Sequence, residues 1–223
     1  MKNTIALQER DTLVVNTELT LLSITQAIAL SFLAEASLDP LVKLDFQWWP
    51  YIGTGLLVIL VFWSRSLMHV LTIIRWPLRF AHNFIYICFT LVESVMFRQI
   101  GSIQPWFALS LASAVLIWIL FAFDLQMVRR LSMEKNRPVD RNLIGIVESD
   151  QRFQLRVVVP VMVMLSALAY ILVAVKPEIF LHDGWHLLLV ASQLLFLSVY
   201  LWRSLLLYTR ILSCMNNAEE HFA

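Results

Sequence analysis

The sequence predicts an all-α membrane protein in which six helices cross the bilayer and both termini lie in the cytoplasm. Three observations lead to this prediction. Of the 223 residues, 59% are hydrophobic and only 15% are charged, and the mean hydropathy is +0.72. Six apolar segments approach the length of about 20 residues that a helix needs to cross the hydrocarbon core. Lys and Arg collect in alternate connecting segments, as they do on the cytoplasmic side of membranes.

The first two predicted spans are marked by their composition and by a proline. The first runs from Leu19 to Ala36, where hydroxyl side chains and Gln26 interrupt the apolar sequence. The second runs from Trp49 to Trp63, and its helix is expected to continue towards Ile74. Pro50 stands near its start, where a helix does not need the N–H that proline lacks.

The remaining four spans are predicted at Phe80–Phe97, Pro105–Phe123, Val157–Val175 and Gly184–Trp202. Pro105 and Gly184 mark entries, and Pro177 follows the end of the fifth span. Tryptophans are enriched where a membrane helix meets the headgroup region, and several lie near predicted ends. These are Trp48, Trp49, Trp106, Trp185 and Trp202.

The basic residues predict the orientation. With both termini inside, fourteen of the seventeen Lys and Arg residues fall on the cytoplasmic side, and only Lys43, Arg98 and Lys176 fall outside. We therefore divide the chain into a cytoplasmic segment (residues 1–17), a six-helix membrane domain (18–211) and a cytoplasmic tail (212–223). The predicted location is the inner membrane of a cell, crossed several times.

The linker from residue 124 to 156 is predicted to be an exposed cytoplasmic segment. It mixes cationic and acidic side chains and contains Pro138 and Gly145. Its apolar patch at Leu143, Ile144 and Ile146 predicts a short helix that docks a cytoplasmic partner protein or lies at the membrane surface.

Motifs for catalysis and metal binding are weak. Cys88 and Cys214 show no paired spacing, so they predict free thiols rather than a zinc or haem site. His182 and His186 are four residues apart, but His182 is expected to precede the helix. No nucleophile elbow or H-E-x-x-H motif occurs. We therefore expect no enzyme, no cofactor, no metal and no nucleic-acid partner.

Glu93 is the one carboxylate well inside a predicted span. Ionisable groups inside membranes are costly and commonly bind protons, ions or substrates. The structural alternative is an ion pair with Arg98, which lies about a turn further along.

The first span separates into two helical faces. Leu21, Thr25, Ile28, Phe32 and Glu35 follow steps of three and four residues and share one face. Around an oligomer axis, Thr25, Ile28, Phe32 and Glu35 would line a pore that narrows at Ile28 and Phe32. The alternative is an ordinary packing helix. A second face carries only small residues and suits close packing against neighbours: Thr20, Ser23, Ala27, Ser31 and Ala34.

Four short sequences carry a family resemblance: AIALSFL at residues 27–33, Trp49-Pro50, ILVFW at 59–63 and RVVVP at 156–160. Together with the six-span layout, they resemble the bacterial homologues of the lysosomal and endosomal potassium channels. The resemblance implies six-helix subunits that assemble as tetramers around their first helices, with Ile28 and Phe32 narrowing the pore. The R-x-x-x-F-S-D signature of that family is absent, because Thr17 and Leu21-Leu22-Ser23 stand at its positions.

Two functions remain open from the sequence. The first is a channel-like oligomeric subunit that passes a cation of the potassium type. The second is a non-conducting membrane sensor, anchor or effector that acts through a cytoplasmic partner.

Overall fold

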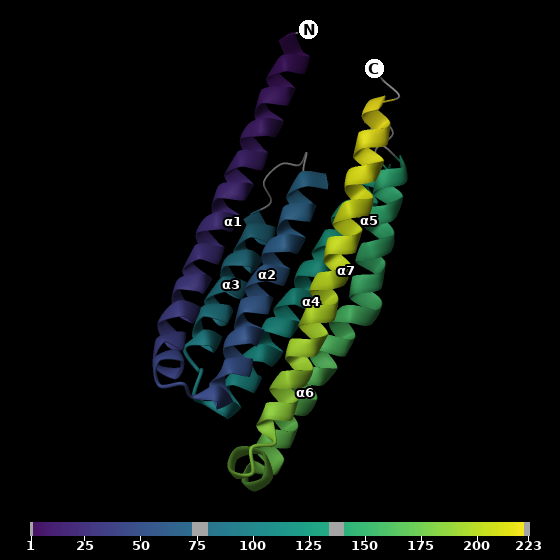
Figure 1. Cartoon of the computed structure of the whole chain (residues 1–223). Helices are drawn as coiled ribbons and strands as arrows, with labels where there is room; N and C mark the ends of the chain where they lie inside the picture. Colours follow the sequence, from purple (N-terminus) through teal and green to yellow (C-terminus); the bar gives the residue numbers. More distant parts are fainter. Residues whose placement is uncertain (1, 73–79, 134–140, 221–223) are drawn as a thin grey trace.

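The computed structural model describes residues 2–72, 80–133 and 141–220, and these fold into seven α-helices (Figure 1). Their bounds are α1 Lys2–Val42, α2 Trp49–Thr72, α3 Phe80–Phe97, α4 Ile103–Met133, α5 Arg141–Phe153, α6 Val159–Val175 and α7 His186–Glu220. The predicted all-α class is confirmed for the described residues.

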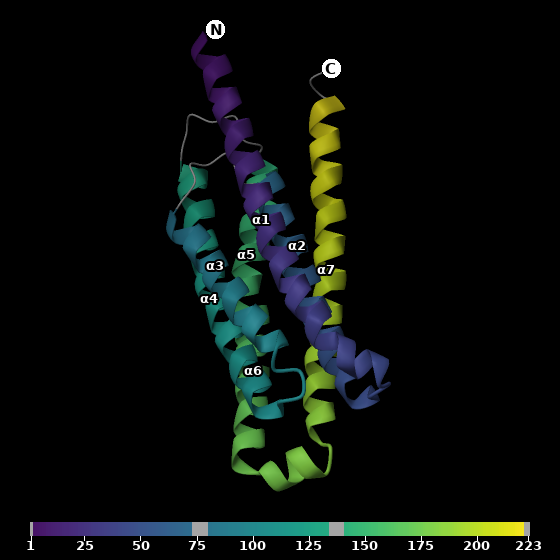
Figure 2. The ribbon, with the colours of Figure 1, turned by 90° about the vertical axis from the view of Figure 1, so that its left-hand side faces the viewer.

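The helices form a ring in which each packs against the next. Its order is α1, α2, α7, α6, α4, α3 and back to α1. The helix α5 continues the line of α6 and packs against α4 and α7. In Figure 1, α1 lies at the left edge of the bundle, and in Figure 2 it crosses the face toward the viewer; in both, the beginning of α1 and the end of α7 lie at the same end.

Five segments of the described chain are long and apolar enough to cross a membrane. They are Val15–Val42, Phe46–Met68, Ile103–Arg129, Gly145–Val175 and His186–Ser213. The apolar part of α3, Asn83–Phe97, is shorter than these. These segments indicate a membrane-embedded protein. The sixth span and the cytoplasmic position of the termini stay predictions.

The described parts of the linker between residues 124 and 156 are not exposed throughout, contrary to what its composition led us to expect. The helix α4 extends to Met133, and Asp124 and Asp150 are both buried. The helix α5 joins α6 through a π-helical turn at Gln154–Val158. Pro160 explains this turn, because its ring clashes with the carbonyl four residues earlier and it has no N–H to donate. The wider turn relieves the clash and keeps the helix continuous.

A close approach holds α1, α2 and α3 together. A Cβ atom placed on Gly55 would lie 2.9 Å from Leu33 Cδ1 and 3.0 Å from Phe97 Cε1, so only glycine leaves these neighbours in place. Small residues let neighbouring membrane helices approach closely, and Gly55 does so here.

The bundle is sealed by aromatic side chains at the end away from α5. Tyr51, Trp106 and Phe107 have no exposed surface, and the rings of Tyr51 and Trp106 meet edge to face at 5.1 Å. Tyr51 also forms a hydrogen bond of 2.8 Å between its hydroxyl and His186 Nδ1. We call Tyr51, Trp106 and Phe107 the aromatic seal.

Candidate functional site

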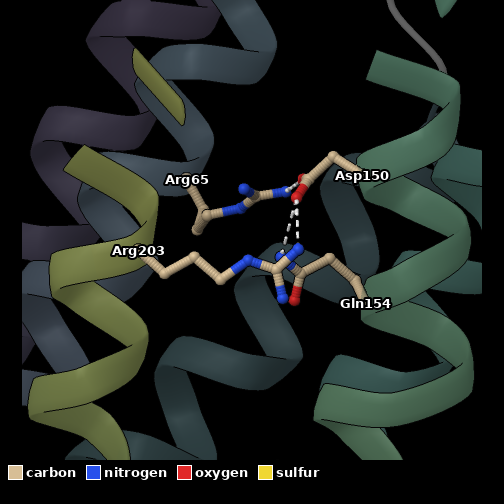
Figure 3. Close-up of polar contacts among 4 residues, drawn as sticks. All are labelled: Arg65, Asp150, Gln154 and Arg203. Carbon is tan, nitrogen blue, oxygen red and sulfur yellow. Dashed lines mark hydrogen bonds and ion pairs between the residues drawn. The ribbon is translucent and has the colours of Figure 1, made fainter. Parts of the chain in front are cut away.

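A buried charge cluster joins three helices near the other end of the bundle (Figure 3). Arg65 of α2 donates a hydrogen bond of 2.6 Å from Nη2 to Asp150 Oδ2 of α5. Arg203 of α7 lies 3.7 Å from Asp150 Oδ1, and Gln154 donates to the same oxygen at 3.3 Å. We call these four residues the charge cluster.

Burial and ring contacts fix the charge cluster in place. The side chains of Arg65 and Asp150 are 11% and 7% exposed, whereas that of Arg203 is 40% exposed. The guanidinium carbon of Arg203 lies 3.4 Å from the centre of the Phe153 ring. A charge removed from water is tolerated only when it is paired and hydrogen-bonded, and Asp150 supplies this partner to Arg65.

A cavity of about 100 Å³ extends from the charge cluster into the ring. Five ring helices and Gln151 of α5 line it, while α1 does not. Its walls are mainly apolar, with Arg65, Asp124 and Tyr200 among the polar lining residues near the α5 end. Such a volume corresponds to about three water molecules at about 30 Å³ each.

Five buried polar atoms of cavity-lining residues have no hydrogen-bond partner among the described residues. They are Arg65 Nη1, Ser113 Oγ, Gln151 Oε1, Gln193 Oε1 and Tyr200 OH. Buried polar groups are normally paired with protein or with water. The cavity therefore presents several separate positions at which a small polar molecule or water is stabilised.

The structure separates the four predicted pore residues. Ile28 is 45% exposed, and Thr25 is half-buried and donates its hydroxyl hydrogen to the carbonyl of Leu22 at 2.9 Å. Phe32 packs against the core, and Glu35 lines an open hollow of about 540 Å³ at the end of α1. Of the two predicted constriction residues, Ile28 is thus the exposed one.

Arg98 brings Phe32 and Glu35 together, a contact that the sequence did not predict. Its guanidinium carbon lies 4.6 Å from the centre of the Phe32 ring, and its Nη2 lies 3.8 Å from Glu35 Oε2. The expected pair between Arg98 and Glu93 is therefore replaced by one with Glu35. Glu93 itself is fully buried, and neither of its oxygens has a hydrogen-bond partner among the described residues.

The small-residue face of α1 points away from the ring. Its five members are all exposed: Thr20, Ser23, Ala27, Ser31 and Ala34. The residues that α1 buries are Leu22, Gln26, Ala29, Leu33 and Ser37 instead. The small face therefore does not pack inside the subunit. We call it the small stripe.

The predicted docking patch lies on α5. Ile146 is half-buried, and its neighbour Val147 is buried within the bundle. The side chains of Leu143 and Ile144 lie outside the described residues. Part of this apolar patch thus stabilises the fold.

Metal chemistry receives no support from the described part of the chain, which contains no group of three His, Cys, Asp or Glu side chains that could hold a metal ion. His182 precedes α7, and His186 bonds to Tyr51.

Comparison with protein-family models, curated proteins and solved structures finds no match. The resemblance to the potassium channel homologues therefore rests on the short sequences quoted above.

The charge cluster was missed by the sequence reasoning, although two signals for it exist. Arg65 interrupts the apolar run ILVFWSRSLM, which is unusual unless a partner is near. Val147, Asp150, Gln151 and Gln154 recur at helical spacing, which marks one buried face of α5.

Proposed function

We propose that the protein is a channel-like membrane subunit that assembles with copies of itself along α1 and passes a small cation between them. The single observation that carries this proposal is the small stripe, which is exposed on α1. Figure 1 shows α1 at the outside of the bundle. Interfaces between membrane helices are enriched in small residues, because these let two backbones approach closely.

The outer faces of α6 and α7 provide the contrast. Met164 and Leu168 on α6 and Leu195 and Val199 on α7 are between 53% and 70% exposed. Bulky apolar side chains suit contact with lipid tails, whereas a row of Ala, Ser and Thr leaves space for a second helix. Among these outer faces, the one on α1 is the best suited to a second copy of the chain.

The pore in this proposal is lined from α1, with Ile28 beside the small stripe as the narrow point. Phe32 is held under Arg98 and belongs to the wall rather than to the constriction. The tetrameric state, the potassium type of ion and the bacterial inner membrane come from the resemblance and form part of the same proposal.

The assembly is tested by disulfide cross-linking in a protein in which Cys88 and Cys214 are replaced by serine. We expect Ala27→Cys to give a covalent dimer on mild oxidation, and Ala191→Cys to give none. Ala191 is a matched control because it is also an exposed alanine, on α7. A dimer from Ala191→Cys alone would refute the α1 interface.

Conduction is tested separately in reconstituted vesicles. We expect potassium flux to change when Ile28→Asn places a polar group at the narrow point, because hydrophobic constrictions close by losing their water. The matched control is Leu195→Asn on the outer face of α7. Flux that is absent, or that responds equally to both substitutions, would contradict a pore along α1.

One observation favours the alternative of a sensor or effector. The ion pair between Arg65 and Asp150 ties α5 to the ring, so a partner bound at α5 acts on α2 and α7 directly. In this case, Ile146→Asp weakens binding of a purified partner, while Ser149→Asp at a neighbouring exposed position does not. Equal binding by both variants would exclude a docking role for Ile146.

A further inference from the structure

Glu93 is the buried ionisable group that the proposed pore along α1 does not use. It has no exposed surface, and no described residue forms a hydrogen bond or ion pair with its carboxyl group. A buried carboxyl in an apolar bundle is expensive unless something polar reaches it. The question is therefore what else lies at its depth in the ring.

The depth of Glu93 follows from one contact between α3 and α4. Ser110 Oγ lies 3.4 Å from Met96 Sδ, and the two helices run in opposite directions. Moving three residues back from Met96 reaches Glu93, and moving three residues on from Ser110 reaches Ser113. Both steps lead one turn towards the α5 end of the bundle. Glu93 and Ser113 therefore lie at one level.

Gln193 lies at the same level on α7. Tyr51 contacts both Trp106 and His186 at the aromatic seal, which aligns α2, α4 and α7 at that level. Since α4 and α7 run in the same direction, seven residues further along them lie Ser113 and Gln193 (Figure 1). Three buried groups without a hydrogen-bond partner among the described residues thus occur at one depth: Glu93, Ser113 and Gln193.

The cavity connects this level with the charge cluster. Glu93 is not itself a lining residue, but Phe89 and Met96, four residues before it and three after it on α3, both line the cavity. Ser113 and Gln193 line it in the middle of the ring, and Tyr200 and Arg65 line it near α5. Gln193 and Tyr200 are seven residues apart, or about 10 Å along α7. About three waters spaced about 2.8 Å apart bridge such a distance. The volume of about 100 Å³ holds about the same number.

The two ends of the cavity differ. Beyond the level of Glu93, the aromatic seal closes the ring with side chains that have no exposed surface. At the α5 end the side chains of Arg65 and Asp150 are largely buried, but that of Arg203 beside them is 40% exposed. We therefore expect water to enter the cavity from the α5 end rather than through the aromatic seal.

We propose that Glu93 is a proton-binding group inside the membrane, reached by a file of about three waters from the α5 end of the bundle. The proton adds to a carboxylate oxygen of Glu93 and leaves from it to the nearest water. Ser113, Gln193 and Tyr200 contribute neutral polar groups to the cavity, which suits a file of waters that carries a proton.

The charges around this route are balanced. From α2, Arg65 faces the cavity and is paired with Asp150 of α5, while Asp124 lines it from α4. Tyr86 and Tyr200 are the titratable groups contributed by α3 and α7. The positive charge of Arg65 is compensated at 2.6 Å, so it does not repel a proton as an isolated guanidinium would.

Infrared spectroscopy of the full chain in lipid nanodiscs tests this proposal. We expect a C=O stretching band of a protonated carboxyl group that disappears in Glu93→Gln. On transfer to D₂O the band shifts as the carboxyl proton exchanges, and the rate of this shift reports access by water. We expect Gln193→Leu to slow the exchange by about tenfold, equivalent to about 1.4 kcal/mol of additional opening free energy.

Matched variants separate the water file from a general change in the bundle. Ser192→Leu makes a similar change at the adjacent, exposed position and is expected to leave the rate unchanged. If Gln193→Leu does not fold, Ser113→Val with Ala112→Val as its exposed control gives the same comparison. The proposal is overturned if no band depends on Glu93, or if the buried and exposed variants exchange at one rate. Neither result depends on whether α1 forms an oligomer.

Discussion

The charge cluster makes a strong prediction for Asp150→Asn. The substitution keeps the size of the side chain and leaves Arg65, whose side chain is 11% exposed, without its negative partner. Removing one partner of a buried ion pair costs about 3–5 kcal/mol of unfolding free energy. The contact with Arg203 adds little, because that side chain is 40% exposed and 3.7 Å away.

The same helix offers a matched control. Arg152 and Glu148 of α5 also pair at 2.6 Å, but their side chains are 48% and 20% exposed. Glu148→Gln is expected to cost about 1 kcal/mol or less. The two substitutions should therefore differ by at least about 2 kcal/mol, a factor of about 30 in the unfolding equilibrium.

Unfolding in mixed micelles with increasing dodecyl sulfate, followed by far-UV circular dichroism, measures this difference. Equal costs for Asp150→Asn and Glu148→Gln would refute the reasoning that burial decides the strength of the pair. A second check replaces both Arg65 and Asp150 by leucine. This double variant should be more stable than Asp150→Asn, because it removes the charge of Arg65 together with that of Asp150.

Three further predictions concern packing and buried polar groups. Gly55→Ala should destabilise the bundle by about 1–3 kcal/mol, because the added Cβ atom would meet two side chains. Gly145→Ala should stabilise α5 by about 0.5–1 kcal/mol, because its Cβ atom would meet no other atom within 4 Å. Thermal unfolding of the two variants measures both effects. Tyr51→Phe should cost about 1–3 kcal/mol by leaving His186 Nδ1 without its partner, measured in the same way. Gln26→Leu should raise stability by about 1 kcal/mol, since both polar atoms of this buried amide lack partners among the described residues; a lower midpoint would contradict this.

The helices were predictable because hydropathy reports the environment of each segment directly. The bounds of Phe80–Phe97 are identical in prediction and structure. Other helices extend beyond their apolar parts, as α1 does towards Lys2, because backbone hydrogen bonds continue through polar residues once a helix has formed. Hydropathy therefore locates a membrane helix better than it locates its ends.

The candidate site was less predictable, because it depends on which helices become neighbours. Arg65 and Asp150 are 85 positions apart in the chain, and the local sequence around each residue does not predict the other as its partner. The linker containing Asp150 was interpreted as exposed from its charges alone. Its helical spacing of buried and exposed positions was the better guide, because charge composition does not reveal which face of a helix turns inward.

For Glu93, one expectation from the sequence agrees with the structure and another does not. The sequence marks it as unusual, an acidic residue within an apolar segment, and the structure places it fully buried in the ring. The expected ion pair between Glu93 and Arg98 was wrong. Arg98 lies near Glu35 of α1 instead, a contact that depends on how α1 packs and not on spacing along α3. Spacing within a helix constrains neighbours on that helix only.

The distance in sequence between Arg65 and Asp150 also has a consequence for how the chain is made. During synthesis α2 emerges first, and its guanidinium has no counter-charge until α5 follows 85 residues later. Until then α2 gains stability by keeping Arg65 near the water interface. The charge of Arg65 is therefore neutralised only when α5 packs against α2, so a helix made late in synthesis completes the environment of one made early.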